Sequence, residues 1–421
     1  MEKRVVITGA VRTPIGKYIG ALKEVEAYKL AALVLEEAAS RSRVAPGIID
    51  EVILGQSYQS GENVNIARVA LLAAGWPVEI PGLTLDRRCL SGLDSVFAGF
   101  VKIKSGYADI IATGGVESMS RAEFYVPGEF VKWGMGGKKD PKWGFMPRGH
   151  GALPMWGIPF FDRIQRARVM SQPVERFGEL NSMMSWAEEA ARKEGITRTE
   201  ADAWALGSHA KAIAAMEKGL FTEEIVSVPT PVKKDRNLVF EADETPRRNM
   251  SLEKLAALPT VYEDGICTAG NSSTENDGAG ALMIMSVSKA GELQAKPLAE
   301  LLSFGVAASD PRLTYPAVPA AVDNALERAG LTLKDIDLIE IQEAFAAQVL
   351  ADAKLMKLGP ADLETRVNVN GSGISLGHPI AATGTMRMVT LLHEMKRRDA
   401  KYGMVAICGG GGHGIAAVVK R

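Results

Sequence analysis

Three residues in this sequence combine a reactive side chain with a setting that favours chemistry. Cys89 opens the run Cys-Leu-Ser-Gly just before an expected helix over 93–105. His378 follows a glycine-rich run that begins at Asn370, again before an expected helix, and Cys408 is followed by four glycines. Because unpaired backbone N–H groups at a helix start favour an anion, we expect a lowered pKa for the Cys89 thiol and a nucleophilic sulfur. A histidine in such a turn can act as a base or as an oxyanion donor.

Each of these residues also has a plain structural interpretation. A cysteine at a helix start is often a small buried residue, and an isolated histidine is usually structural. The glycines after Cys408 allow backbone amides to approach a ligand closely. However, the Lys-Ser or Lys-Thr of a phosphate loop is missing, and no GxGxxG stands between a strand and a helix. The residues therefore disfavour NTP and NAD binding.

An internal repeat indicates how two of the reactive residues could meet. Residues 27–56 and 317–343 both read as an amphipathic helix, a linker and an apolar strand that opens with Ile-Asp. This Ile-Asp sets an offset of 287 residues, and Cys89 and His378 stand 289 residues apart. A helix and a strand follow each of them, with strands over 110–115 and 404–410. The pattern predicts an α/β fold of two βαβ-type halves, each with a largely parallel sheet, about a pseudo-twofold axis. Chance agreement between the two positions is the alternative.

Residues from about 122 to 248 interrupt the repeat. Segment 130–161 is rich in Gly, Pro, Trp and Lys, which is typical of a loop-dominated lid. Helices are expected over 183–194 and 199–218, followed by a polar connection through 233–236. We interpret 122–248 as an inserted substrate-binding segment. Residues 1–121 with 249–294 then form the first half, and 295–421 form the second.

The composition excludes several classes of protein. The 49 Lys and Arg residues balance 50 Asp and Glu among 421 residues, which argues against nucleic-acid binding. No stretch approaches the roughly 20 apolar residues of a membrane span, and the start lacks a secretory signal, so we expect a cytoplasmic protein. Three cysteines without CxxC spacing predict neither a disulfide framework nor a metal site.

Five short motifs occur in the order in which thiolases carry them, and together they span nearly the whole chain. They are Cys89-Leu90-Ser91-Gly92-Leu93, Gly114-Gly115-Val116-Glu117-Ser118-Met119-Ser120, Gln342-Glu343-Ala344-Phe345, Gly377-His378-Pro379 and Cys408-Gly409-Gly410-Gly411. Residues 12–16 and 268–273 also look like thiolase segments. The resemblance implies the duplicated, five-layer αβαβα thiolase fold with an inserted loop domain. It also implies that Cys89 is acylated, His378 activates it, and Cys408 moves a proton to or from the α-carbon of the substrate.

The resemblance further implies how a substrate is held. One oxyanion hole is made by the backbone amides of Cys89 and Gly410, and the other by His378 with a water held at Gln342. Coenzyme A is a substrate, and no bound cofactor is implied. The residues expected at the CoA are Ser273 against the pantetheine, Met183 and Phe345 as its apolar walls, and Arg247 near the nucleotide. Helix packing for Met183 and a solvated charge for Arg247 are the plain alternatives.

Three positions depart from the common biosynthetic pattern. Gln342 stands where asparagine is usual, Ala381 where glycine is usual, and His413 where methionine is frequent. These departures favour a degradative enzyme that cleaves 3-oxoacyl-CoA to acetyl-CoA and a shortened acyl-CoA. An acetoacetyl-CoA-forming biosynthetic thiolase, a ketoacyl synthase-like condensing enzyme and a catalytically weak acyl-CoA-binding subunit are the alternatives. The family predicts a homodimer or homotetramer, with a partner subunit as a further alternative.

Overall fold

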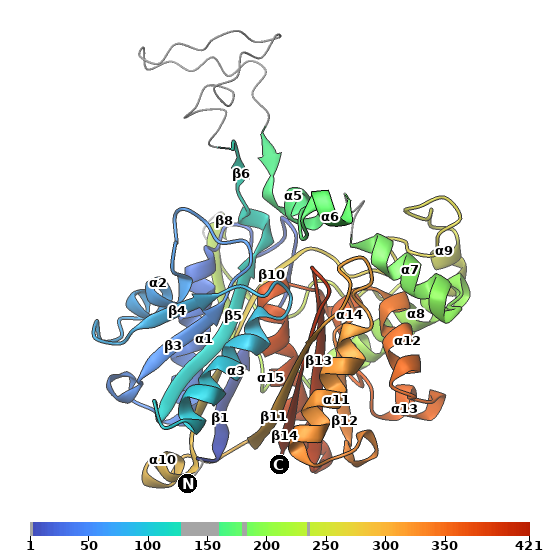
Figure 1. The fold of residues 1–421 in the computed structure, drawn as a ribbon. Coiled ribbons are helices and arrows are strands. Elements are labelled where there is room, and N and C mark those ends of the chain that lie inside the picture. Colours follow the sequence, from blue (N-terminus) through green and yellow to red (C-terminus); the bar gives the residue numbers. More distant parts are fainter. Residues whose placement is uncertain (1–2, 128–159, 179–182, 234–235) are drawn as a thin grey trace, which may run out of the picture.

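The computed structural model describes residues 3–127, 160–178, 183–233 and 236–421. Its main elements form two series in the same order (Figure 1). The first is β1 (Val5–Arg12), α1 (Ala27–Ser42), β3 (Glu51–Gly55), α3 (Ser91–Lys104), β5 (Ile110–Ser118) and β10 (Asn276–Ser286). The second is β11 (Ala299–Ala308), α11 (Ala317–Ala329), β12 (Leu338–Ile341), α15 (Thr383–Arg398), β13 (Tyr402–Gly409) and β14 (His413–Lys420). The duplication predicted from the repeat is therefore present in the fold.

The Ile-Asp of the repeat has the same structural task in both halves. The Asp50 carboxylate accepts hydrogen bonds of 2.7 and 2.9 Å from the backbone N–H groups of residues 109–110, where β5 begins. The Asp337 carboxylate accepts two bonds of 2.8 Å from residues 401–402, where β13 begins. Each aspartate thus satisfies two backbone donors at a strand entrance.

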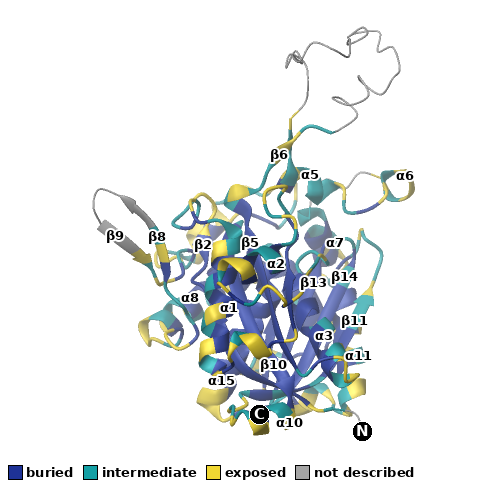
Figure 2. Ribbon diagram, turned by 90° about the vertical axis from the view of Figure 1, so that its left-hand side faces the viewer, coloured by how far each residue is buried: buried dark blue, intermediate teal, exposed yellow. Residues whose placement is uncertain are grey.

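The two halves form five layers. In sheet order the strands run β12-β13-β14-β11-β1-β10-β5-β3-β4, with β4 at Gly82–Leu85, and a short pairing of β1 with β11 connects the strands of the two halves. Helix α1 covers the outer face of the first sheet, and α11 covers that of the second (Figure 1). Helices α3 and α15 lie between the sheets. The buried strands form the centre of the molecule in Figure 2.

The sheets are mixed, so the expectation of a largely parallel sheet in each half was wrong. β3 pairs in parallel with β4 and β5, and β12 with β13, whereas β1, β10, β11 and β14 pair antiparallel. Alternation of helix and strand indicates crossovers, but β14 follows β13 directly through a tight hairpin. Cys408 lies near the end of β13, the last strand but one.

Glycines allow the two central helices to approach each other. A Cβ on Gly92, in α3, would lie 2.5 Å from the backbone oxygen of Ala381. In return, a Cβ on Gly384, in α15, would lie 2.7 Å from the backbone nitrogen of Leu93. Larger residues would therefore force the helix starts apart. This contact between halves brings the residues just before each helix together.

The segment that interrupts the repeat contains β6 (Phe124–Tyr125), β7 (Phe161–Asp162), α5 (Arg163–Val169), α6 (Val174–Phe177), α7 (Met184–Glu194), α8 (Arg198–Glu217), β8 (Val228–Lys233) and β9 (Arg236–Phe240). Helices α7 and α8 match the expected helices within one residue. At the expected polar connection, Lys233 and Arg236 instead pair in the strands β8 and β9. Residues 130–159 of the expected lid, with Trp133, Trp143 and Trp156, lie outside the described residues. The remaining elements are β2 (Gly16–Lys17), α2 (Ile66–Ala73), α9 (Leu252–Ala256), α10 (Val287–Glu292), α12 (Ala346–Leu355), α13 (Pro360–Thr365) and α14 (Gly373–Leu376).

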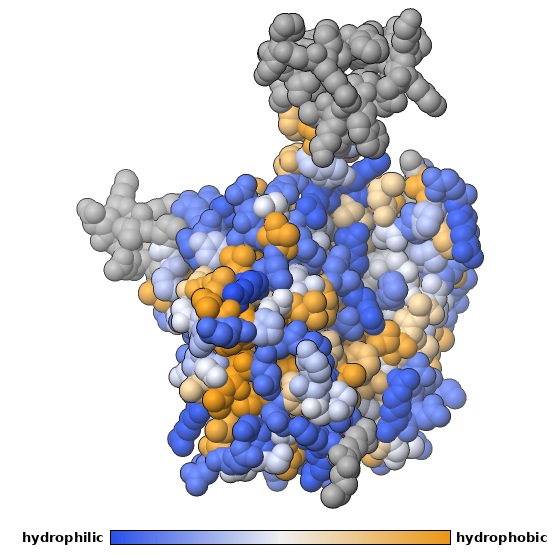
Figure 3. Space-filling model, turned by 60° about the vertical axis from the view of Figure 1, so that its left-hand side comes forward, coloured by the Kyte–Doolittle hydropathy of each residue, from blue (hydrophilic) through white to orange (hydrophobic). Residues whose placement is uncertain are grey.

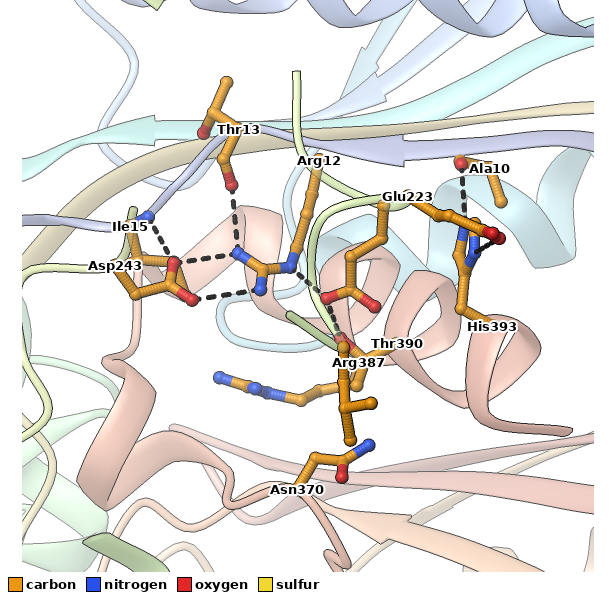
Figure 4. Close-up of polar contacts among 12 residues, drawn as sticks. Ala10, Arg12, Thr13, Ile15, Glu223, Asp243, Asn370, Arg387, Thr390 and His393 are labelled. Carbon is orange, nitrogen blue, oxygen red and sulfur yellow. Dashed lines mark hydrogen bonds and ion pairs between the residues drawn. The ribbon is translucent and has the colours of Figure 1, made fainter. Parts of the chain in front are cut away.

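A buried ion network fastens this segment to the first strand (Figure 4). The Arg12 guanidinium lies 2.6 Å from a Glu224 oxygen and donates two bonds, of 2.8 and 3.0 Å, to Asp243. The Ile15 N–H donates to the same Asp243 at 2.8 Å. Because Arg12 is only 1% exposed, removing either carboxylate would weaken the pairing of a buried charge. Residues 12–16, one of the two further segments that look like thiolase segments, thus have a structural role.

Candidate active site

Cys89 lies in a tight turn between β4 and α3. Arg88, just before it, has φ of 54°, a left-handed conformation that non-glycine residues rarely adopt. The turn is held by the Ser91 hydroxyl, which donates to the Arg88 carbonyl and accepts from the Arg87 N–H at 2.8 Å. The Arg88 N–H donates to Asp86 at 2.7 Å. These bonds fix the sulfur at the start of the helix.

His378 faces Cys89 across the boundary between the halves. Its Nε2 lies 3.3 Å from the Cys89 Sγ, and its Nδ1 lies 2.7 Å from the Thr383 hydroxyl. If Nδ1–H donates to Thr383, Nε2 is left free to accept the thiol proton. The backbone before the ring is constrained by Gly377, whose φ is 108° and whose Cβ would lie 2.7 Å from the Asn276 side chain. Asn276 in turn accepts the His378 N–H at 2.8 Å.

Cys408 approaches the same place from the end of β13. Gly409 ends β13, and the next three glycines form the turn of the β13–β14 hairpin, in which Gly411 and Gly412 have φ of 85° and 82°. A Cβ on Gly409 would lie 2.1 Å from Leu90, so this strand packs directly on the Cys89 turn. The glycine run therefore serves the hairpin and a close contact rather than a phosphate.

One cavity of about 260 Å³ joins these residues. Cys89, His378, Cys408 and Gly410 all line it. The rest of its wall is largely apolar and aromatic, with methionines from the first half and from the inserted segment, as is usual in pockets for small molecules. Lining residues outside the reactive group include Tyr58, Met119, Arg168, Met183, Trp186, Ser273, Glu275, Tyr315, Phe345, Gln348 and Ile380.

The residues predicted to contact CoA divide into two groups. Met183, Ser273 and Phe345 line the cavity. The Met183 methyl group packs so closely on Gly410 that a Cβ added to Gly410 would lie 2.7 Å from it. Arg247 is not among the lining residues: its side chain is exposed, and its backbone N–H donates to His209 Nδ1 at 3.1 Å. The structure therefore brings three of the four to the site.

Gln342 is also not among the residues that line the cavity. Its side chain is fully buried, and its amide oxygen accepts a hydrogen bond of 3.3 Å from Arg387 Nε. Its amide nitrogen has no hydrogen-bond partner within the described part of the chain and lies against Gly373. Arg387 also donates to the Gly377 carbonyl at 2.9 Å, so one buried cation holds Gln342 and the backbone that precedes His378. Figure 4 shows Arg387 beside the Arg12 network.

Burial dominates the electrostatics of the reactive group. It raises the pKa of Cys89 to about 11, although the backbone N–H groups of Gly410 and of Cys89 itself act in the opposite direction. The expectation of a lowered pKa was therefore wrong, because the loss of solvation outweighs the helix start. Burial also lowers the pKa of His378 to about 3, assisted by the charges of Arg387 and Arg168. Burial raises the pKa of Cys408 well above its usual value. All three groups are neutral near pH 7.

Sequence reasoning missed two supporting residues. Asn276 is fully buried and holds the His378 backbone, as described above. Glu117 accepts backbone N–H groups from Ser57, Tyr58 and Ala381, which ties the first half to the turn after His378. Burial raises the pKa of Glu117 to about 7. Glu117 stands in one of the five motifs, so the sequence did point to this residue. The spacing of the motifs does not show which backbone N–H groups its carboxylate binds.

Two further observations concern the described residues. None of their helices is long and apolar enough to cross a membrane. No group of three His, Cys, Asp or Glu side chains among them could hold a metal ion.

Comparison with known proteins identifies the family. Residues 5–288 match the family described as "Thiolase, N-terminal domain", and residues 295–421 match "Thiolase, C-terminal domain". Acetyl-CoA acetyltransferase of Pseudomonas aeruginosa is 40% identical over 99% of both chains. A probable acetyl-CoA acyltransferase of Staphylococcus aureus is 39% identical over 99% of both chains.

Solved structures agree with this assignment. The crystal structure of the Bacillus anthracis acetyl-CoA acetyltransferase has a TM-score of 0.88 and 38% identity, over 100% of this chain and 99% of that one. Human mitochondrial 3-ketoacyl-CoA thiolase has a TM-score of 0.87 and 33% identity, over 99% of both chains. This chain belongs to the thiolase family of acetyl-CoA acyltransferases.

Proposed function

We propose that the protein catalyses CoA-dependent thiolysis of a 3-oxoacyl-CoA, or the reverse Claisen condensation, through a thioester on Cys89. The observation that carries this proposal is the 3.3 Å approach of His378 Nε2 to the Cys89 sulfur in a cavity that Cys408 also lines. A base beside a nucleophile, with a second acid in reach, is the arrangement that covalent acyl transfer needs. The departures at Gln342, Ala381 and His413 favour the degradative direction.

In the first half-reaction, His378 Nε2 takes the thiol proton as the Cys89 sulfur attacks the 3-oxo carbon. The bond between the α-carbon and that carbon then breaks, which leaves an acyl thioester on Cys89 and the enolate of acetyl-CoA. Cys408 gives its proton to the α-carbon of the enolate, and acetyl-CoA departs. Because His378 and Cys408 begin neutral, each is in the protonation state that its step requires.

In the second half-reaction, a CoA thiol gives its proton to the Cys408 thiolate and attacks the acyl thioester. The Cys89 sulfur leaves and recovers its proton from His378, so the enzyme returns to its starting state. A cysteine thioester is about as reactive as the CoA thioester it replaces, so neither half-reaction ends in a deep trap.

Two oxyanion holes belong to the proposal. The amides of Cys89 and Gly410, which already point at the Cys89 sulfur, would receive the oxygen of the acyl group. His378 with a water held by Gln342 would receive the oxygen of the acetyl thioester. The Gln342 amide nitrogen is buried and has no hydrogen-bond partner among the described residues, which is compatible with a water at that position. Loss of one such donor typically costs about 100- to 1,000-fold in rate.

The decisive test is intact-protein mass spectrometry after incubation with acetoacetyl-CoA and longer 3-oxoacyl-CoAs. The wild type and a Cys267→Ala control are expected to gain the mass of an acyl group, and Cys89→Ala is expected to gain none. Cys267 is a suitable control because it is buried but does not line the cavity. An adduct that survives in Cys89→Ala, or no adduct with any substrate, would refute the thioester.

Cys408 is tested separately. Cys408→Ala is expected to keep acylation of Cys89 by acetyl-CoA but to lose exchange of the acetyl methyl protons with deuterium oxide. Exchange at the wild-type rate would show that another group moves the proton. A protein that binds acyl-CoA without ever acylating Cys89 would instead favour the alternative of a catalytically weak subunit.

The oligomeric state is part of the same proposal. Strand β4 ends the sheet, and large apolar side chains nearby are exposed, with Leu72 at 41%, Val78 at 64% and Leu83 at 38%. Figure 3 shows apolar surface on the side of the molecule that carries α2 and β4 in Figure 1. An unpaired apolar edge favours a second copy, so we propose a homodimer that covers β4. Light scattering of Leu83→Lys should show monomers where the wild type shows dimers.

A further inference from the structure

The lining of the catalytic cavity includes two groups of residues, which we call its two sides. Met183, Ser273 and Phe345, the residues proposed for CoA, form one side. The other side is built where α5 docks on the first half. There the side chains of Ile164 and Ala167 pack with an apolar cluster, and residues of both the cluster and α5 face the cavity. The lining residues of this side are Tyr58, Met119, Gln165, Arg168, Val169 and Ile380. If CoA enters along the first side, the acyl chain is directed to the second.

An ion pair of Arg168 with Glu275 brings two charges to this side. Arg168 Nη2 lies 2.6 Å from a Glu275 oxygen, and both residues line the cavity. Their side chains are 29% and 21% exposed, so both charges keep some contact with solvent. Arg168 Nη1 also donates to Gln165 Oε1 at 3.2 Å, which holds the guanidinium against α5.

The pair lies beside the reactive group. The Glu275 backbone forms an isolated β-bridge with His378, so the residue that carries the carboxylate adjoins the proposed base. The charge of Arg168 is among the causes that lower the pKa of His378, and it also acts on Tyr58. An acyl chain that leaves Cys89 on this side meets the two charges early.

We infer that the Arg168–Glu275 ion pair limits the acyl chain and restricts the protein to short 3-oxoacyl-CoAs. The inference rests on the proposed function. An alkyl tail laid over the pair would remove the remaining water from both charges and offer no hydrogen bond in exchange. On an apolar wall, by contrast, each added methylene would improve binding about fourfold. The preference for longer chains therefore ends where the tail reaches the pair.

The test compares kcat/KM for thiolysis of straight-chain 3-oxoacyl-CoAs of four, six, eight and ten carbons. For the wild type we expect the ten-carbon substrate to be at least about tenfold poorer than the best short one. In the double variant R168L/E275L the ratio of ten-carbon to four-carbon kcat/KM should rise at least about tenfold, because the charges are replaced by apolar surface. The matched control is R166L, on the same helix but not lining the cavity, which should keep the wild-type profile.

A second measurement uses only the wild type, so it does not require the double variant to fold. Calorimetric titration of the wild type with saturated acyl-CoAs should show affinity that stops rising once the chain passes the length preferred in thiolysis. A wild type whose kcat/KM or affinity grows steadily to ten carbons would overturn the inference, as would a double variant with an unchanged ratio. A wild type inactive on every 3-oxoacyl-CoA would instead overturn the proposed function.

Discussion

The resting state of Cys89 gives the sharpest prediction. With the pKa raised to about 11, a simple titration leaves about 0.01% of the sulfur as thiolate at pH 7 and about 1% at pH 9. An unperturbed cysteine with a pKa of about 8.5 would be about 3% and 75% ionised at the same pH values. The pKa of His378, lowered to about 3, gives the same conclusion, since a thiolate–imidazolium pair would need a base that holds its proton at neutral pH.

Far-ultraviolet absorbance reports thiolate directly. We expect the difference between the wild type and Cys89→Ala to stay near zero from about pH 6 to about pH 9. Cys267→Ala serves as a control for the loss of a buried thiol that lies outside the cavity. Cys89 would then ionise only during attack on a carbonyl, with His378 taking the proton in the same step. One full equivalent of thiolate at pH 7 that disappears in His378→Ala would refute the argument that burial dominates.

Three other predictions follow from packing and buried charge. Glu117 has a pKa of about 7 in the folded protein, whereas its usual value is 4.5. Between these two pH values the folded state therefore binds more protons than the unfolded state. The free energy of unfolding should fall as pH rises through this range, by at most about 3 kcal/mol. Urea titrations should show a smaller slope in Glu117→Gln than in the wild type, while Glu340 and Asp277, whose pKa values burial also raises, keep their contributions in both proteins. Arg387→Met should lower kcat about 100-fold with little change in KM, because Gln342 loses its donor; a rise in KM at constant kcat would contradict this. Gly305→Ala should lower the free energy of unfolding by about 3 kcal/mol, because the added Cβ would lie 1.9 Å from the Ala321 carbonyl oxygen. Gly47 has open space around it, so Gly47→Ala should leave the free energy of unfolding unchanged in the same experiment.

The fold was largely readable from the sequence because it is duplicated. The helix periodicity and the repeated Ile-Asp are local features of the sequence, and both occur in the two halves with nearly the same spacing. The Asp50 and Asp337 carboxylates show why the dipeptide recurs, since each binds the backbone at the entrance of a neighbouring strand. Strand direction was not readable, because antiparallel pairs such as β1–β10 join segments far apart in the chain.

The candidate site was found in part. Cys89, His378 and Cys408 carry reactive side chains in glycine-rich runs, and such runs are local signals. The Arg168–Glu275 pair and the Asn276 support gave no such signal, because their partners are set only when distant segments pack. The placement of Gln342 away from the cavity lining, and of Arg247 at the surface, likewise depends on neighbours that a motif does not name.

Residue types and their spacing were enough to identify the residues that can react, the two repeated halves and the family that the chain resembles. Only the tertiary structure decided the protonation state of the reactive group. A helix start favours a thiolate at Cys89, but the two halves enclose the sulfur in a cavity, and the resulting loss of solvation has the larger effect on its pKa. The tertiary structure also decided the shape and charge of the acyl wall. Burial and contact between distant segments set both properties, and neither is a local property of the chain.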